Sequence, residues 1–469
     1  MSSANRVRVA YIKETAYGVT PTATVPDPWR ELRKTSESLS GTPSTTESAE
    51  ARTDRQSAGQ ITTGLEVKGN VEAELAGSIC FKDMLLAGTK FDNSNTTHGY
   101  AGTAGTWGAV IEDDVEVTIA FTPKAGVELH SHVTLTATNA TTFTDIVAEF
   151  SKVGKNRVKG HILQIINTGG APGTLTGLSG KNKKCIYIPR GIIFSQGSAA
   201  GAAIGTVTSS SIIGFAKDMA NEAGKLVTLS SPEIASIGVL DISYTLEKRF
   251  TDLTGPTVVG GAGYVKTIVY RGALVDVMSM NFAYGEIAKA SFSYVANDHE
   301  TPLVPLAPLD STAPILLTAP EAHIALNASV DVGLVIVDDM PTAYCIQSLS
   351  VELNNNSKAQ NCIGSIAPEK YTQGSAAIKV TMTAYLEDSN WEYLDKKIKS
   401  TPIQVMYYAL NQDGGVGVNI PDLQLSFDDP NATGKDAIVE LSISGTAKVT
   451  TKPVYGGNSM FVYWLKPTG

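Results

Sequence analysis

The sequence has few of the residues that build catalytic and metal centres. Its 469 residues include only four cysteines and six histidines. The cysteines are Cys80, Cys185, Cys345 and Cys362. None belongs to a CxxC pair, so we expect reduced, partly buried thiols, with a disulfide between the last two as the alternative. His130 and His132 would share one face of a strand, but a metal site needs further ligands.

No catalytic set of side chains can be nominated either. The sequence offers no serine–histidine–aspartate or cysteine–histidine combination that stands out. Its glycine-rich stretches, "VVGGAGY" and "DGGVGVN", lack the lysine and the strand–loop–helix context of a phosphate-binding loop, so they are expected to be turns. The sequence therefore predicts a protein that is not an enzyme and that holds no cofactor or metal.

Long hydrophobic runs and an excess of positive charge are also missing. The opening stretch "MSSANRVRVAYIKE" has no apolar signal segment, and no other segment approaches a membrane span. The formal net charge of −9 argues against a wide basic surface for nucleic acid. Apolar residues make up 42% of the chain, which permits a sizeable core. We expect a protein made in a cytosol, with no membrane partner.

What the sequence does have is a strong period of two. Apolar and polar residues alternate along Val67–Leu75, Ile378–Leu386 and Val439–Val449. Such alternation predicts antiparallel strands with one buried face and one wet face. Two further stretches are expected to be hairpins: one turns at Tyr284–Glu286, and the other turns at Asn354–Asn356.

Helices are predicted at only two places, each directly after a strand. "SICFKDMLLAG" is expected to end at Gly88. "SNWEYLDKKIKS" is expected to begin at Ser389 or Asn390 and to bury an apolar stripe of Trp391, Leu394 and Ile398. Lysines crowd its last turn, where the helix dipole favours positive charge.

The two strand–helix units match in register, with Lys68 aligned to Lys379 and Ala73 to Ala384. This indicates an internal duplication, although strand–helix units are common enough for a chance match. The strand patterns predict an all-β dominated, antiparallel fold, duplicated in the chain, with a flanking helix in each repeat and a small β insert.

The domain boundaries follow from composition. The first β domain is expected to comprise residues 1–125 and 225–300, with an N-terminal arm and a long polar loop over 35–60. A small β insert occupies 126–224, a proline-rich linker 301–320, and the second domain 321–469.

Several stretches, in this order, resemble a known family. These are "KETAYGVTP", "GLEVKGNVEAELAGSICFKDMLLAG", "ISYTLEKRFTDL", "YRGALVDVMSMNFAYGEIAKASFSYV" and "TAYLEDSNWEYLDKKIKSTP". The sequence is similar to the tail tube (major tail) proteins of long-tailed, non-contractile bacteriophages. The resemblance covers most of the chain outside residues 125–225. It implies β-sandwich domains that assemble, six around, into stacked rings enclosing the channel through which the genome passes.

The resemblance also implies roles for particular residues. Polar strand faces are expected to line the channel, and the candidate residues are Lys68, Glu72, Glu74 and Glu440. The 35–60 loop is expected to join stacked rings, and the candidates are Ser36, Glu37, Glu47, Arg52, Asp54 and Arg55. The acidic net charge predicts a net negative lumen that lets DNA slide rather than bind. The insert is expected on the outside of the tube, because extra mass would block the channel.

A duplicated chain needs only three copies for six tube domains. We therefore expect homotrimeric rings with pseudo-sixfold symmetry, with a homohexamer as the alternative. The implied partners are other copies of the chain, a tape measure protein, tail terminator and tail tip proteins, and passing viral DNA that is not bound specifically. The implied location is the virion tail, assembled in the cytoplasm of the bacterial host. The alternative functions are a baseplate hub or decoration protein, and a carbohydrate-binding or adhesive β protein.

Overall fold

The computed structural model describes the strands and helices on which the two predicted repeats depend. The described residues are 6–21, 29–49, 59–91, 108–109, 117–120, 160–166, 185–187, 226–230, 232–254, 265–302, 306, 323–342, 344–431, 434–435, 438–452 and 455–467. His130, His132 and "VVGGAGY" lie outside them, so the expectations for those residues stay predictions.

Antiparallel strands of the first part of the chain pair in the order β1–β12–β13–β14–β5–β4. Their bounds are β1 Val7–Lys13, β4 Ser40–Glu47, β5 Gln60–Glu74, β12 Tyr244–Thr254, β13 Val265–Ala283 and β14 Lys289–Ala296. Three short strands flank this set, namely β2 (Arg30–Glu31), β3 (Ser36–Glu37) and β15 (Asp298–Glu300).

Strands of the later part pair in a matching order, β16–β22–β23–β24–β21–β18. Their bounds are β16 Val332–Val337, β18 Ile346–Asn354, β21 Ala377–Tyr385, β22 Ile403–Asn411, β23 Gly414–Leu425 and β24 Glu440–Ala447. In both sets a helix follows the fifth strand of the order, α1 (Ile79–Thr89) after β5 and α3 (Glu392–Ile398) after β21. The two sets thus have the same connectivity and the same neighbours.

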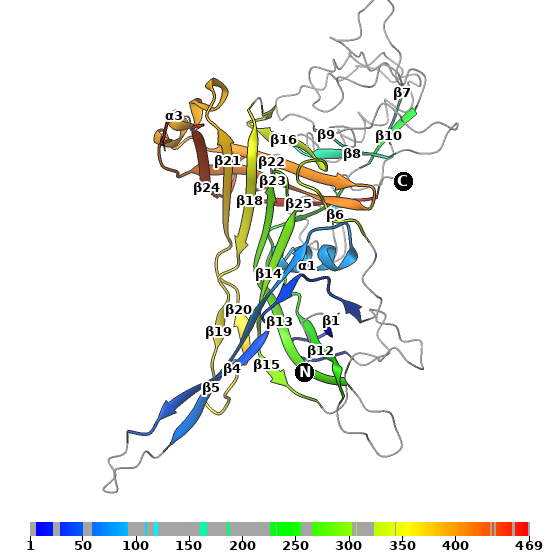
Figure 1. Ribbon diagram of the computed structural model, residues 1–469, viewed down its shortest axis with the longest axis vertical. Helices are drawn as coiled ribbons and strands as arrows, with labels where there is room; N and C mark the ends of the chain where they lie inside the picture. Colours follow the sequence, from blue (N-terminus) through cyan, green and yellow to red (C-terminus); the bar gives the residue numbers. More distant parts are fainter. Residues whose placement is uncertain are drawn as a thin grey trace, which may run out of the picture.

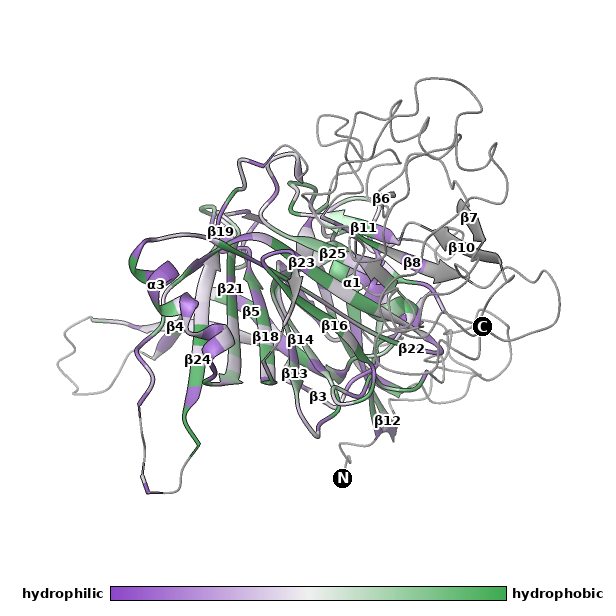
Figure 2. Cartoon of the chain, turned by 90° about the horizontal axis from the view of Figure 1, so that it is seen from above, coloured by the Kyte–Doolittle hydropathy of each residue, from purple (hydrophilic) through white to green (hydrophobic). Residues whose placement is uncertain are grey.

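The two sets meet edge to edge. The second half of β13 pairs with β18, from Val277 opposite Asn354 to Ala283 opposite Ser348. The result is one sheet in the order β5–β14–β13–β18–β21–β24, whose long strands run along the body in Figure 1. Apolar and polar residues alternate along these strands, as the green and purple bands of Figure 2 show. The strand-dominated, antiparallel fold predicted from the sequence is confirmed.

The core lies between this sheet and a second layer, which the long strands β13 and β23 connect to it. The first half of β13 pairs with β12, while its second half pairs with β14. β23 likewise passes from β22 to β24. Every residue of β22 is buried, because both of its faces are covered. β25 (Phe461–Leu465) extends this layer by pairing with β23 and with β11 (Glu233–Ser236).

Part of the predicted insert packs on the second set of strands. β8 (Ile162–Ile166) and β9 (Cys185–Tyr187) pair with each other in a small sheet. The buried His161 ring lies 2.6 Å from the Tyr463 hydroxyl, measured from Nδ1. Gln164 donates to the Lys466 carbonyl at 2.6 Å. The described residues of the insert are therefore anchored to the C-terminal strand.

The first helix runs past the glycine that was expected to end it. α1 ends at Thr89, and Lys90 forms the left-handed cap with φ of 53°. Gly88 is required instead for packing, because a Cβ there would meet Met278 Sδ at 2.6 Å. A glycine that permits close approach of a helix to a strand thus looks, in sequence, like a helix stop.

The second helical segment also differs from its prediction. A single 3-10 turn, η6 (Asp388–Asn390), precedes α3, and the buried Asn390 donates to the Tyr385 carbonyl at 2.6 Å. The predicted apolar stripe is wrong at two of its three positions, because Trp391 is 60% exposed and Ile398 is 79% exposed. Leu394, the third residue of the stripe, is partly buried against the core. Tyr393 is buried in place of the two exposed side chains.

Two smaller expectations are corrected as well, and the cysteines agree with the expectation of reduced thiols. The segment predicted to return from Asn354–Asn356 and pair with β18 is β19 (Lys358–Gln360), which instead pairs with β20 (Lys370–Thr372). "DGGVGVN" is a turn only at its start, because strand β23 begins at Gly414. The four cysteines are free; Cys80 and Cys185 are buried, whereas Cys345 and Cys362 are exposed, so the alternative disulfide does not form.

A buried carboxylate ties the N-terminal arm to the sheet. Glu14 follows β1 directly and is 7% exposed. It accepts hydrogen bonds from the Ser243 hydroxyl (2.6 Å), the Thr245 hydroxyl (2.8 Å), and the backbone amides of Gly18 (2.8 Å) and Gly272 (2.9 Å). Four donors compensate the cost of burying this acid, and removing it would leave them unpaired.

We predict that Glu14→Ala lowers the free energy of unfolding by about 3 kcal/mol, because charged hydrogen bonds are lost and buried donors are left without partners. Urea denaturation followed by fluorescence measures the change. Glu47→Ala, at an exposed position, is the control and should shift the midpoint little. Equal midpoints for the two variants would contradict the anchoring role of Glu14.

Candidate assembly and channel surfaces

One face of the six-strand sheet is polar from end to end. The registers align Glu72 with Ser291, Ser279 with Ser291, and Ser279 with Glu352. They continue from Glu352 to Lys379, and in the neighbouring row from Thr383 to Ser442. Because side chains alternate along strands, all four channel candidates (Lys68, Glu72, Glu74 and Glu440) share this face.

Carboxylates outnumber amines on this polar face. The acidic residues on it are Glu66, Glu72, Glu74, Glu352 and Glu440, and the basic ones are Lys68, Lys289 and Lys379. Lys68 lies 2.9 Å from Glu66, and Gln347 donates to Glu440 at 2.9 Å. The remaining side chains of the face are mostly serine, threonine and asparagine, so the surface is wet and mildly acidic.

The described part of the predicted 35–60 loop is mostly strand rather than loop. Ser36 and Glu37 lie in β3, and Glu47 ends β4; both strands pair with β5. The Ser36 hydroxyl donates to Glu72 at 2.9 Å, and Glu37 lies 2.7 Å from Lys248. Arg52, Asp54 and Arg55 fall outside the described residues. The stretch forms a strand despite its polar composition because β5 runs well beyond the predicted Val67 start and offers backbone partners.

The β4–β5 hairpin projects from the body at the lower left of Figure 1. The equivalent connection in the second set, between β18 and β21, lies beside it, since the Leu65 amide donates to the Ile366 carbonyl at 2.6 Å. Two large apolar side chains of that connection are exposed: Ile363 and Ile366. Both long connections therefore point the same way from the sheet.

A second group of exposed apolar side chains lies at the other end of β21 and β24. It consists of Trp391 and Ile398 on the helical segment and Ile438 just before β24. Side chains of this size usually mark a contact surface when they gather on one part of a soluble protein. Sequence reasoning missed this group, because a period of 3.6 residues does not reveal which face of a short helix is buried.

The comparison with protein families bears on these surfaces directly. A family model described as phage tail tube protein matches residues 4–447. The chain belongs to the phage tail tube protein family. A search of curated proteins found no match to this tube protein.

Membership in the family makes the chain a structural component of the bacteriophage tail, which assembles with further copies and other tail components into a tube. The sequence-based prediction of a tail tube protein is confirmed. The match favours that function over a baseplate hub, a decoration protein or a carbohydrate-binding protein.

The described residues contain no cluster of three or more histidine, cysteine, aspartate or glutamate side chains placed to hold a metal ion. Within the same part of the chain, no helix of the tube protein has the length and apolarity that crossing a membrane requires.

Sequence reasoning did not find the β13–β18 pairing, which joins the two sets of strands. The only signal was the alternation of β14, of β18 and of the second half of β13, and that pattern does not reveal partners. The pairing brings the predicted channel residues Glu72 and Glu440 of the tube protein onto one continuous face, although 368 positions separate them in the sequence numbering.

Cys362 lies in the exposed connection between β19 and β20, where the reactivity of its thiol can be measured. Its thiol donates to Glu369 at 3.1 Å, and this hydrogen bond and the carboxylate charge raise the pKa of Cys362 above its usual range. Because the thiolate is the nucleophile, a raised pKa lowers the reactive fraction at neutral pH.

We predict that Glu369→Gln speeds alkylation of Cys362 by iodoacetamide near pH 8 by several-fold. The alkylation rate of the exposed Cys345, measured in the same sample by peptide mass spectrometry, is the control and should not change. Equal rates at Cys362 in the two proteins would show that Glu369 does not set its pKa.

Proposed function

We propose that the protein forms homotrimeric rings with pseudo-sixfold symmetry, which stack into the tube of a long, non-contractile tail. The observation that carries this proposal is the repeated strand order: two sets of six strands with the same neighbours, one after the other in a single chain. If each set is one tube domain, three chains supply six. A homohexamer is the alternative.

In such a ring, the polar face of the sheet would line the channel. Serine, threonine and asparagine side chains keep that face wet, and the carboxylates outnumber the lysines on it. A net negative wall would repel the phosphate backbone, so that viral DNA passes without binding. The 126–224 insert would then lie outside the tube, where added mass does not obstruct passage.

Ring stacking is assigned to the β4–β5 hairpin, with the β18–β21 connection beside it. An extended hairpin that projects beyond the body can reach a neighbouring ring, at about 3.3 Å per residue. Ser36, Glu37, Glu47, Arg52, Asp54 and Arg55 remain the candidate residues. The tube would assemble in the host cytoplasm around a tape measure protein and end at terminator and tip proteins.

We predict that shortening the hairpin abolishes tube formation but not folding. Thr45 pairs with Thr62, so the residues between them can be replaced by Asn-Gly, which closes a two-residue hairpin turn. Negative-stain microscopy should show rings or single subunits but no tubes, with unchanged circular dichroism. Glu286→Gln, at the exposed turn between β13 and β14, is the control and should form tubes. Normal tubes from the shortened protein would refute the stacking role.

The channel assignment has a separate test. In phage carrying Glu72→Lys and Glu74→Lys, we expect intact tails but slower genome ejection, because new positive charge binds DNA phosphates. The delay should grow at low salt, where screening is weakest. Asp388→Lys with Asp395→Lys adds the same charge on the helical segment and should leave ejection unchanged. If ejection by the Glu72→Lys, Glu74→Lys phage is unchanged at every ionic strength, these residues do not face the lumen.

A further inference from the structure

The continuous sheet ends in two free edges. At one end β3 and β4 pair only with β5 among the described strands. At the other end β23 pairs with β24 only through Leu423–Leu425, and the ladder stops where the Ser426 amide donates to the Ser444 carbonyl at 2.8 Å. Unpaired edges of this kind are the places where a sheet accepts another strand.

The intramolecular junction indicates what each free edge corresponds to. Aligning Lys68 with Lys379 makes β4 the equivalent of β18, because Ser40 pairs with Lys68 as Glu352 pairs with Lys379. The same alignment makes Ser444 the equivalent of Ser293. The strand that follows Ser426 is then the equivalent of the second half of β13.

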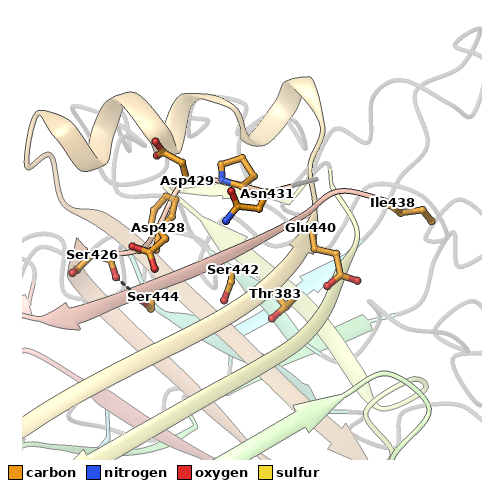
Figure 3. A pocket seen from close by; sticks show the side chains of 11 residues that line it. Thr383, Ser426, Asp428, Asp429, Asn431, Ile438, Glu440, Ser442 and Ser444 are labelled. Carbon is orange, nitrogen blue, oxygen red and sulfur yellow. Dashed lines mark hydrogen bonds between the residues drawn. The ribbon is translucent and has the colours of Figure 1, made fainter. Parts of the chain in front are cut away.

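In the first set, that second half of β13 is covered by β18 of the same chain. In the second set, the equivalent segment Ser426–Asp429 has no such neighbour in the described chain. It leaves β24 and lies beside α3, where Lys397 Nζ is 4.7 Å from the centre of the Phe427 ring and 2.6 Å from Asp429. An open hollow of about 900 Å³ separates this segment from the polar face of β21 and β24. Figure 3 shows the hollow, with Asp428 on one side and Thr383 and Ser442 on the other.

We propose that β4 of a second copy of the chain pairs antiparallel with Ser426–Asp429, in the register of the β13–β18 junction. This interface rests on the self-assembly proposed above and adds the two edges and their register. We apply the residue pairs of the β13–β18 junction to the equivalent residues of the two free edges. In this register, the following residues of the second copy and of the first lie opposite each other: Thr42 and Ser426, Gly41 and Phe427, Ser40 and Asp428, and Leu39 and Asp429.

Prolines bound this four-residue pairing at both ends. Pro43 follows Thr42 on one edge, and Pro430 follows Asp429 on the other. Proline has no amide hydrogen to give to a ladder and is found at edges and strand ends. The pairing is therefore shorter than the seven-residue internal junction, which suits a contact that must form only during assembly.

The two edges carry opposite charges on the polar face, and side chains cap some of their outward backbone groups. On the polar face, Asp428 would lie next to Ser40 of the second copy, which pairs with Lys68 of that copy. In the single chain, side chains occupy the outward backbone groups: the Leu39 amide donates to Glu37 at 3.1 Å, and the Phe427 carbonyl accepts from Lys397 at 3.1 Å. Side chains that occupy an edge in this way limit its pairing with unrelated strands.

A cysteine pair tests the register. In a background with Cys345→Ser and Cys362→Ser, the double variant Ser40→Cys with Asp428→Cys should form disulfides between chains under mild oxidation. The two positions form a non-hydrogen-bonded pair, in which facing side chains come closest. Thr45→Cys with Asp428→Cys is the matched control, because it moves one thiol five residues, roughly 17 Å, along the same strand.

Denaturing gels without reductant give the outcome. Cross-linking in tubes at Ser40 and not at Thr45 supports the interface, and a covalent ladder that ends at three chains also supports trimeric rings. A ladder that ends at six supports the interface but contradicts the trimer. Tubes that cross-link equally at Thr45, or not at Ser40, overturn the interface while leaving the tube function intact. A parent protein that forms neither tubes nor rings overturns both.

Charge reversal gives an independent readout. Asp428→Lys should slow assembly about two- to fivefold, because it places a positive charge near Lys68 of the second copy, whose strand lies behind Ser40. Adding Lys68→Glu to it should restore the rate measured by light scattering. Absence of rescue would show that these two side chains do not face each other.

Discussion

The pairing of β13 with β18 is the contact on which the rest of the architecture depends. It joins two sets of strands with the same internal order into a single sheet, and it does so with backbone hydrogen bonds over seven residue pairs. Because the period of a strand is two, that register also decides which side chains share a face. A shift by one residue would send Met278 and Met280 to the wet face and Ser279 and Asn281 into the core.

The β13–β18 junction inside the chain indicates how the free edges of two neighbouring chains pair. The same strands that meet inside the chain have equivalents at its two free edges, and those edges are polar, short and bounded by proline. The core side of each strand set is closed by helix α1 or α3 and by the second sheet. Within the described six-strand sheet, the edges left for pairing are its two ends, which is the arrangement expected of a subunit whose sheet is completed by its neighbours.

Local patterns in the sequence predicted local structure well. The alternation of Ile378–Leu386 and of Val439–Val449 located β21 and β24 to within about two residues. Every second residue of such an antiparallel strand is buried and apolar, so the strand can be recognised from the sequence. The turn at Tyr284–Glu286 was found for the same reason, with Gly285 at φ of 79°. The family resemblance, which the match over residues 4–447 confirmed, predicted the function.

The sequence was less informative where tertiary contacts decide the outcome. Gly88 serves helix–strand packing rather than a helix stop, and the exposure of Trp391 and Ile398 depends on what covers α3. Ser40–Glu47 became a strand because β5 provided a partner, although its own composition is that of a loop. Strand partners, above all β18 for β13, are set by the whole fold, and no short pattern encodes them.

The central claim is that the two strand sets of one chain are two tube domains, joined by the β13–β18 pairing. Helical reconstruction of assembled tubes by electron cryomicroscopy tests this most directly. The account predicts three chains in each ring, with six similar wall segments and the internal β13–β18 junction alternating with an intermolecular β23–β4 junction around the ring. A ring of six chains, or a ring in which the two strand sets occupy non-equivalent places in the wall, would contradict it.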